Sequence, residues 1–368
     1  MQDNTNHESA LKVNEGIEQP PSVNEDAVSK YKNKQKYLPS VAELSKGILK
    51  GDRTMLSRAI TLIESSLPQH QILAQEVIEQ CLPHSGKSIR IGITGVPGAG
   101  KSTFIESIGK HLTSLGKKIA VLAIDPSSER SKGSILGDKT RMEELAVDAN
   151  AFIRPSPSAG TLGGVARKTR ESIILCEAAG FDVIFIETVG VGQSETLVHS
   201  MVDFFLLLMI AGAGDELQGI KRGIMEMADA IVVNKADGDN IQRAQMARSQ
   251  YANALHLFSP ISSGWIPLVE TCSAYTKDGI DDVWKMICNY EKLVVENGYF
   301  EQNRKHQSEY RMFETINEML KVSFYSDKEI EKLIPEVTKE LLENKISSYV
   351  AANKLMDKYY KDIQNREI

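Results

Sequence analysis

One stretch decides the fold of this chain: Gly95-Val96-Pro97-Gly98-Ala99-Gly100-Lys101-Ser102, which fits the phosphate-binding pattern G-x-x-x-x-G-K-[ST]. Residues 89–94 before it form an apolar run typical of a buried strand, and residues 103–115 after it have helical apolar spacing. On such a strand–loop–helix turn, glycines let successive backbone N–H groups point at phosphate oxygens. Lys101 would reach the β- and γ-phosphates, and the Ser102 hydroxyl would bind Mg²⁺. We therefore predict a nucleoside triphosphate site held by Gly95, Pro97, Gly98, Ala99, Gly100, Lys101, Ser102 and Thr103.

Two later motifs predict that the bound base is guanine. Asn234-Lys235-Ala236-Asp237 follows an apolar run and fits the pattern N-K-x-D. An aspartate in the last position accepts hydrogen bonds from the N1–H and the exocyclic amine of guanine, a donor pair that adenine lacks. Two charge-assisted bonds of about 1.5–3 kcal/mol each would favour GTP over ATP by roughly 10²–10⁴-fold. Cys272-Ser273-Ala274 ends another apolar run and matches the short loop whose backbone N–H groups bind guanine O6. The base-binding candidates are Asn234, Lys235, Asp237, Ser273 and Ala274.

An acidic strand end, Glu187-Thr188-Val189-Gly190, supplies the next candidates. The Glu187 carboxylate can hold the hydration shell of Mg²⁺ or the attacking water, and the Gly190 N–H can bind the γ-phosphate and sense its loss. Most small GTPases have a water-orienting Gln directly after this glycine, where this chain has Val191. We therefore expect slow intrinsic hydrolysis unless another group or a partner helps. Gln193 and Glu195 are both near enough in sequence to substitute, although the segment itself reads as a switch.

Two aspartates in the first third of the chain are further metal candidates. Asp125 ends the second predicted strand, and an acidic residue at a strand end that faces Mg²⁺ and phosphate is typical of such sites. Asp138 lies in the polar loop 133–139, where the residues alone leave a solvated loop aspartate equally open.

Seven apolar runs alternate with helical patterns between about residues 88 and 290. The expected strands are 89–94, 118–124, 151–154, 183–187, 204–210, 230–234 and 266–271. Strands buried on both faces and separated by helices predict an α/β fold, a doubly wound and mostly parallel sheet. Ligands of such sheets bind at the carboxyl ends of the strands, where every motif above falls.

Composition divides the rest of the chain. Residues 1–38 are polar with almost no apolar periodicity, which predicts a disordered tail. We expect an N-terminal helical extension over 39–86, a P-loop GTPase domain over 87–290 and a C-terminal helical region over 291–368. The C-terminal helices have much apolar surface for an appendage, which indicates packing on the sheet domain, on a second subunit, or on both.

Bulk composition argues against several classes of partner and location. A formal charge of −6 and a pI near 5.8 oppose a nucleic-acid or anionic-membrane partner engaged by bulk electrostatics. The longest apolar run, 204–210, is too short to span a membrane. The four cysteines are widely spaced, which favours reduced thiols over a disulfide framework or a zinc site. The first arginine is Arg53, and an acidic start resembles neither a transit peptide nor a secretory signal, so we expect a cytoplasmic protein.

Four motifs taken together resemble the MeaB/ArgK family: Asp125–Ser128, Gly160–Arg167, Glu187–Glu195 and Gly212–Lys221. These G-proteins accompany adenosylcobalamin-dependent methylmalonyl-CoA mutase, and the human member is linked to methylmalonic aciduria type A. The resemblance implies a P-loop G domain flanked by helices and a homodimer formed through the C-terminal ones. It further implies a GTP-hydrolysing chaperone that gates adenosylcobalamin loading onto the mutase and protects the mutase. It does not choose among acyl-CoA mutases as the client.

The same resemblance implies roles for individual residues. The catalytic residues would be Lys101, Asp138, Glu187 and Gly190. The Mg²⁺ that accompanies GTP or GDP would be held by Ser102, Asp125, Asp138 and Glu187. A switch that contacts the mutase would include Gln193, Asp215, Glu216, Gln218 and Lys221.

Two other functions stay open from the sequence. A nickel-insertion GTPase shares the fold class, but it uses Cys and His clusters that the scattered cysteines here do not form. A P-loop kinase would bind a second phosphorylated substrate, for which Arg167, Lys168 and Arg170 are candidates, although a solvated or partner-facing basic helix surface is the commoner interpretation. The N-K-x-D motif opposes a preference for ATP. The chain also lacks D-x-H-x-x-G, by which the mutase holds cobalamin, so it is not itself the mutase.

Overall fold

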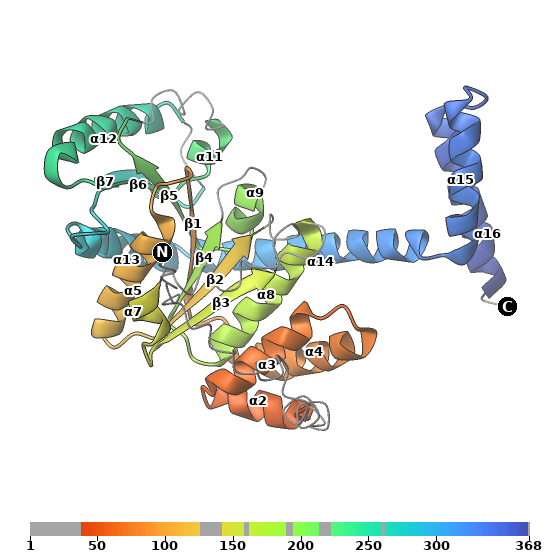
Figure 1. Cartoon of the computed structure of the whole chain (residues 1–368), viewed down its shortest axis with the longest axis horizontal. Helices are drawn as coiled ribbons and strands as arrows, with labels where there is room; N and C mark the ends of the chain where they lie inside the picture. Colours follow the sequence, from red (N-terminus) through yellow and green to blue (C-terminus); the bar gives the residue numbers. More distant parts are fainter. Residues whose placement is uncertain are drawn as a thin grey trace, which may run out of the picture. The chain divides into compact units, whose positions relative to one another are not determined.

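A sheet of seven parallel strands forms the centre of the computed structural model, which describes residues 38–125, 142–157, 162–188, 194–212, 222–258 and 262–366 (Figure 1). The strand order is β3-β2-β4-β1-β5-β6-β7, and every neighbouring pair is parallel. The strands are β1 (Ile89–Gly95), β2 (Ile119–Asp125), β3 (Ala151–Pro157), β4 (Val183–Thr188), β5 (Phe204–Ile210), β6 (Ala230–Asn234) and β7 (Leu268–Thr271). The predicted α/β sheet is confirmed, and each expected strand is present.

The topology of the sheet places the phosphate-binding motif. Strand β1 lies between β4 and β5 in the middle of the sheet. From β1 the chain crosses to β2 on one side of it, and later it enters β5 on the other side, which makes a topological switch point beside β1. Ligands of open α/β sheets bind outside the carboxyl ends of the strands at such a point. The motif 95–102 begins with the last residue of β1 and therefore lies there.

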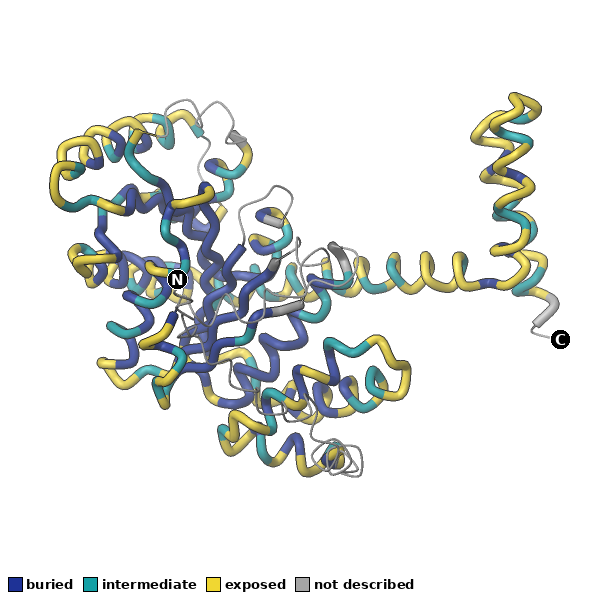
Figure 2. Tube along the Cα trace, viewed as in Figure 1, coloured by how far each residue is buried: buried dark blue, intermediate teal, exposed yellow. Residues whose placement is uncertain are grey.

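Two apolar cores, one on each face, enclose the strands between helices, so that the strands are mostly buried (Figure 2). The helices of one core are α5 (Lys101–Ser114), α7 (Glu143–Ala146), α11 (Arg222–Glu226), α12 (Ile241–Leu255) and α13 (Ile280–Glu296). The helices of the other core are α2 (Val41–Leu49), α3 (Arg53–Glu64), α4 (Pro68–Cys81), α8 (Leu162–Ala178) and α9 (Ser194–His199). Cover on both faces explains why β4 and β6 are buried at every residue and, before their polar carboxyl ends, are continuously apolar rather than alternating in sequence.

The three helices before β1 belong to the second core. Leu56, Ile60 and Ile63 on α3 are almost completely buried there, together with residues of α8. The Asp52 carboxylate caps α3 by accepting hydrogen bonds from the N–H groups of its first turn. The apolar side chains of the N-terminal helical extension therefore form core packing. The short 3-10 turn η1 (Leu82–His84) leads from α4 toward β1. Of the expected tail 1–38, only Leu38 lies within the described residues.

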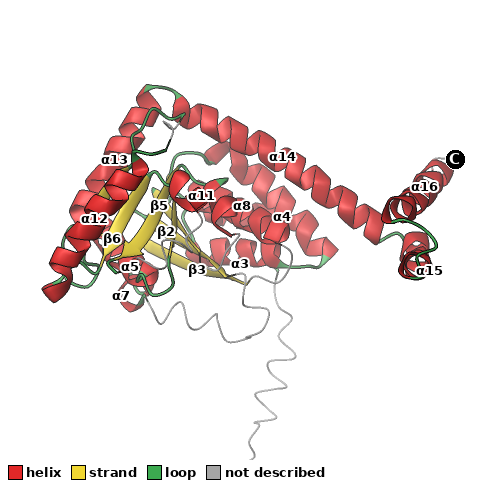
Figure 3. Cartoon of the chain, turned by 90° about the horizontal axis from the view of Figure 1, so that it is seen from above, coloured by secondary structure: helices red, strands yellow, loops and turns green. Residues whose placement is uncertain are grey.

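The chain ends in long helices that differ from the rest in exposure. Helix α14 (Tyr299–Tyr325) contacts α13 and α8, and then continues to α15 (Lys328–Leu342) and α16 (Ser348–Arg366) (Figure 3). Its 27 residues correspond to a length of about 40 Å, and none of them is buried. At its far end, Phe324 packs on Tyr359 of α16 with ring centroids 5.2 Å apart. None of the described helices has the length and apolarity needed to cross a membrane.

Candidate functional site

Two glycines shape the loop that follows β1. Gly95 has a φ of 155°, and a Cβ added to it would lie 2.1 Å from the carbonyl oxygen of Leu208 on β5. Gly100 has a left-handed φ of 83°, and its added Cβ would lie 2.9 Å from Asn234 Nδ2. Any side chain at these positions would push the loop away from β5 and β6. The loop therefore enters α5 with its backbone close to the sheet, at a helix N-terminus that favours anions.

Lys101 is folded into this loop and is 9% exposed. Its Nζ donates hydrogen bonds to the carbonyl oxygens of Gly95 at 3.0 Å and Val96 at 3.3 Å. Burial lowers the pKa of Lys101, and the negative charges of Glu187 and Glu195 oppose that shift. An ammonium group held by two carbonyl oxygens can exchange them for phosphate oxygens, which are stronger, charged acceptors.

Ser102 and Glu187 come together beside the same loop. Ser102 Oγ donates to Glu187 Oε1 at 3.0 Å, and this bond joins the start of α5 to the end of β4. Glu187 is 7% exposed. Mg²⁺ prefers oxygen ligands and usually takes one or two protein groups together with substrate phosphates and water. The neighbouring hydroxyl and carboxylate oxygens therefore fit Mg²⁺.

The other predicted metal and catalytic residues are placed only in part. Asp125 is the last residue of β2, and β2 pairs with β4, so its backbone reaches the same edge of the sheet as Glu187. Asp138 and Gly190 lie outside the described residues. In the parts of the chain that the structure describes, no group of three or more His, Cys, Asp or Glu side chains could hold a metal ion. Those parts therefore contain no Cys and His cluster of the kind that nickel insertion requires.

Asn234 connects the base-binding motif to the phosphate-binding loop. This side chain is 1% exposed, and its Nδ2 donates to the carbonyl oxygen of Ala99 at 2.8 Å. Its Oδ1 accepts from the backbone N–H of Ala274 at 3.0 Å. One side chain thus holds the loop after β1 and the loop after β7 at a fixed separation.

The two base-binding loops are also bonded to each other. The Ala236 N–H donates to the Cys272 carbonyl oxygen at 3.0 Å, and the Ser273 hydroxyl donates to the Asp237 carboxylate. Lys235, the second residue of the N-K-x-D motif, has a left-handed φ of 61°. The arrangement brings Asp237 next to the 272–274 loop, where a guanine base could contact both. Pro97, Gly98 and Thr103 complete the predicted set and lie in the loop or at the start of α5.

The predicted switch falls outside the part that the structure describes. This holds for Gln193, Asp215, Glu216, Gln218 and Lys221. Glu195, which the sequence left open as a substitute for the usual Gln, lies in the first turn of α9 and is 5% exposed. Its negative charge opposes the lowering of the Lys101 pKa by burial.

Three basic residues of α8 have roles that the sequence did not predict. Arg170 is only 5% exposed, and its Nη2 donates to Ser200 Oγ at 2.7 Å. Lys168 Nζ donates to the carbonyl oxygen of Glu64 at the end of α3 at 3.0 Å. Arg167 Nε lies 3.8 Å from the Glu171 carboxylate. The interpretation of Arg170 as part of a solvated helix surface is therefore wrong. Helical periodicity could have flagged it, since Arg170 lies four residues after the buried Ala166.

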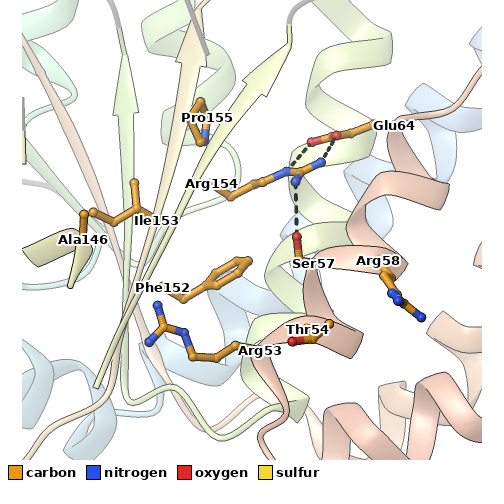
Figure 4. Close-up of a pocket in the computed structure, with 10 residues that line it drawn as sticks. All are labelled: Arg53, Thr54, Ser57, Arg58, Glu64, Ala146, Phe152, Ile153, Arg154 and Pro155. Carbon is orange, nitrogen blue, oxygen red and sulfur yellow. Dashed lines mark hydrogen bonds and ion pairs between the residues drawn. The ribbon is translucent and has the colours of Figure 1, made fainter. Parts of the chain in front are cut away.

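A cavity of about 490 Å³ lies elsewhere, between α3 and the edge strand β3 (Figure 4). Arg154 crosses from β3 to α3, where its Nε donates to Glu64 Oε1 at 3.1 Å and its Nη1 to Ser57 Oγ at 3.4 Å. Arg53 Nη1 donates to the carbonyl oxygen of Asp148 at 3.1 Å. None of the predicted nucleotide-binding residues lines this cavity. We therefore assign its polar groups to docking of α3 on the edge of the sheet.

The chain is similar to several relatives of known name and to a solved structure. A putative GTPase of Caulobacter vibrioides is 50% identical over 86% of this chain and 97% of its own. The GTPase ArgK of Escherichia coli is 49% identical over 78% of this chain and 87% of its own. A mouse protein named methylmalonic aciduria type A homolog, mitochondrial, is 46% identical over 86% of this chain and 79% of its own. The crystal structure of a LAO/AO transport system kinase superposes with a TM-score of 0.71 at 38% identity, covering 87% of this chain and 99% of that one.

A family model agrees with the relatives. The model described as methylmalonyl Co-A mutase-associated GTPase MeaB matches residues 56–329, which include the loop after β1, the acidic end of β4 and both base-binding loops. The chain therefore belongs to the MeaB family of GTPases.

Proposed function

We propose that this GTPase is a chaperone for adenosylcobalamin-dependent methylmalonyl-CoA mutase, which gates loading of the cofactor onto the mutase and protects the mutase. The observation that carries the proposal is the match of residues 56–329 to a family named for association with this mutase. The mouse relative, named for methylmalonic aciduria, supports the same client. A chaperone role also suits the apolar Val191, because a site without the usual water-orienting Gln acts as a timer that a partner can accelerate.

GTP binding in this proposal involves three groups of residues, which bind the phosphates, the guanine base and Mg²⁺. Backbone N–H groups of 95–102 and the Lys101 ammonium hold the phosphates, and Asp237 with the 273–274 loop binds guanine. Ser102 and Glu187, joined in our proposal by Asp125 and Asp138, hold Mg²⁺, which when bound neutralises phosphate charge. We assign Lys101, Asp138, Glu187 and Gly190 to the hydrolysis step, and Gln193, Asp215, Glu216, Gln218 and Lys221 to the switch that meets the mutase.

The C-terminal region 291–368 is proposed to form a homodimer. Many of its large apolar side chains are exposed, which include Met312, Phe313, Ile316, Met319, Leu320, Val322, Tyr325, Leu342, Tyr349, Val350 and Tyr360. Exposed apolar surface of this extent on adjoining helices is typical of protein–protein contact. A second copy of the chain would cover these side chains with an equivalent surface.

Complex formation with the mutase tests the proposed client. The purified chain is mixed with the methylmalonyl-CoA mutase of the same organism, with GDP, GTP or a non-hydrolysable GTP analogue, and both association and GTP turnover are measured. We expect a complex in at least one nucleotide state and faster turnover in its presence. Lys101→Ala is the matched control, since it removes the phosphate contact while leaving the surface unchanged. Absence of a complex in every state, together with unchanged turnover, would exclude this client, and another acyl-CoA mutase would then be tried.

A metal-binding measurement separates the remaining alternative. A nickel-insertion GTPase would bind Ni²⁺ tightly and with fixed stoichiometry, and equilibrium dialysis would detect this. We expect no such site.

A further inference from the structure

Helix α9 links the nucleotide site to the C-terminal helices. Its first turn contains Glu195, which is 5% exposed, and its body packs on β1, which runs into the phosphate-binding loop. Its last residue, His199, is followed by the short segment 200–203, which leads into β5. The helix is only six residues long, so a displacement of one end moves the other.

The body of α9 is packed directly on the central strand. Gly92 on β1 lies under α9, and a Cβ added to Gly92 would lie 2.8 Å from Val198 Cγ1 and 2.9 Å from Phe205 Cδ2. Val198 itself is 0% exposed. Close packing of this kind leaves little room for α9 to bend or to tilt independently of its ends.

Two side chains from other helices donate hydrogen bonds to the segment that follows α9. Arg170 on α8 donates from Nη2 to Ser200 Oγ at 2.7 Å, and Ser200 Oγ in turn donates to the Leu197 carbonyl oxygen at 2.7 Å. Gln307 on α14 donates from Nε2 to the Val202 carbonyl oxygen at 2.7 Å. The Arg170 guanidinium also lies 5.7 Å from the ring centroid of Tyr310, one helical turn after Gln307. The end of α9 is thus bonded to α8 and α14 together.

A second, stronger attachment keeps α14 fixed at this place. Arg304 Nε and Nη2 bind the Asp203 carboxylate at 2.9 and 2.7 Å, and Asp203 also accepts from the Arg90 N–H at 2.8 Å. The Arg304 and Asp203 side chains are 13% and 2% exposed. Because this pair is buried and bidentate, it anchors α14 beside the segment that follows α9.

We propose that Arg170 and Gln307 are positioning residues for GTP hydrolysis: by holding Ser200 and Val202 they fix the end of α9, and so keep α9 in place on β1, the strand that ends in the phosphate-binding loop. The same bonds transmit the nucleotide state from the carboxyl edge of the sheet to α14. The inference rests on the GTPase activity of the family and does not depend on the mutase partner.

Steady-state kinetics with matched variants test the positioning role. Arg170→Ala and Gln307→Ala should each lower kcat for GTP by about tenfold, as a small misplacement near the reacting groups does, while the affinity for GDP changes by less than about twofold. Arg170→Lys should recover only part of the loss. The lysine ammonium keeps the positive charge, but it reaches Ser200 less well than the guanidinium does. The control is Lys168→Ala, which removes a hydrogen bond from the same helix to α3 and should leave kcat unchanged.

A double-mutant cycle and hydrogen exchange give readouts that a purely structural role would not move. Ser200→Ala should cost little in the Arg170→Ala background if the two side chains act through one bond. Exchange of the α14 amides should differ between the GDP state and a non-hydrolysable GTP analogue in the wild type and in Lys168→Ala, and this difference should vanish in Arg170→Ala. The proposal is overturned if kcat is unchanged in both alanine variants, if kcat, GDP affinity and melting temperature all fall together, or if wild-type α14 shows no nucleotide-dependent exchange. Should Arg170→Ala not fold, Arg170→Lys and Ser200→Ala carry the same test.

Discussion

The carboxyl edge of the sheet and the C-terminal helices differ in how far their side chains are buried. At the sheet edge, Asn234 and Ser273 are 1% and 0% exposed and bond the loops to one another. On the C-terminal helices, Met319 and Tyr325 are 66% and 64% exposed. The first region is completed by its own side chains, whereas the second presents apolar surface that another protein surface would complete. Substitutions in the first region should therefore change nucleotide binding and turnover. Substitutions in the second should change the association of the chain with another protein surface.

The largest effect is expected at Lys101. Lys101→Ala removes the cation that meets the phosphates, and GTP turnover should fall by roughly 10²–10³-fold, as for loss of one electrostatic stabiliser of the transition state. Burial opposes the charge of this side chain, so its removal should not lower the melting temperature. Turnover assays and thermal denaturation check both parts. Lys118→Ala, at an exposed position, serves as the control. Near-normal turnover in Lys101→Ala would show that the loop after β1 takes no part in GTP hydrolysis.

The next effect concerns the choice of base. Asp237→Ala should weaken GTP binding by roughly 10²-fold and leave ATP binding as weak as before, because the two hydrogen bonds to guanine are lost. Titration with fluorescent GDP and ADP measures this. Asp239→Ala, two residues later at an exposed position, should change neither affinity. Equal binding of ATP and GTP by the wild type would contradict the base assignment.

A third variant tests the other region. Met319→Lys combined with Leu320→Lys places two charges on the exposed apolar face of α14, and two lost apolar contacts of about 1.5 kcal/mol each should weaken a dimer by roughly 10²-fold. Light scattering after size-exclusion chromatography measures the mass. Asn317→Lys adds a charge at an exposed polar position of the same helix and should leave the mass unchanged. If the wild type is monomeric at all concentrations, the proposed homodimer is wrong.

The smallest effect is expected at a structural carboxylate far from both regions. Hydrogen bonds from Lys110, Asn150 and Thr113 lower the pKa of Asp148 from 3.8 to about 2. A carboxylate whose pKa is lower in the folded state stabilises the protein above pH 3.8 and loses this effect as the pH falls toward 2. Asp148→Asn should therefore lower the free energy of unfolding by about 1–2 kcal/mol at pH 7, with allowance for screening, and by much less near pH 2. Chemical denaturation at the two pH values measures the difference. A penalty that is equal at both would show that the charge is unimportant.

The strands were predictable because parallel strands covered on both faces are continuously apolar. The two largest errors have local causes. Strand β3 continues to Pro157, whereas the expected strand ended at Arg154, so it includes Pro155 and Pro157. Strand β3 pairs only with β2 and lies at the edge, where a missing N–H is tolerated. Strand β7 begins at Leu268 and not at Ile266, which is 71% exposed.

The site was predictable where a motif is short and contiguous. The loop after β1, N-K-x-D and the 272–274 loop each fit a local pattern, and the fold brings them together. What sequence reasoning missed are contacts between residues distant in the chain, such as Arg304 with Asp203, 101 positions apart, and Arg170 with Ser200. The residue type of a charged side chain does not show whether it is solvated or buried against a partner that is distant in the sequence. Only the packing of α8 and α14 on the sheet decides between the two.

Asn234 has a consequence for the kinetics of the nucleotide cycle. Its bonds to Ala99 and Ala274 join the phosphate-binding loop to the loop after β7, so one side chain sets the spacing of both parts of the site. These two bonds do not have to break when a nucleotide leaves or binds, so the part of the site that they hold costs little ordering on binding. We therefore expect ordering of these two loops to contribute little to the barrier for nucleotide association.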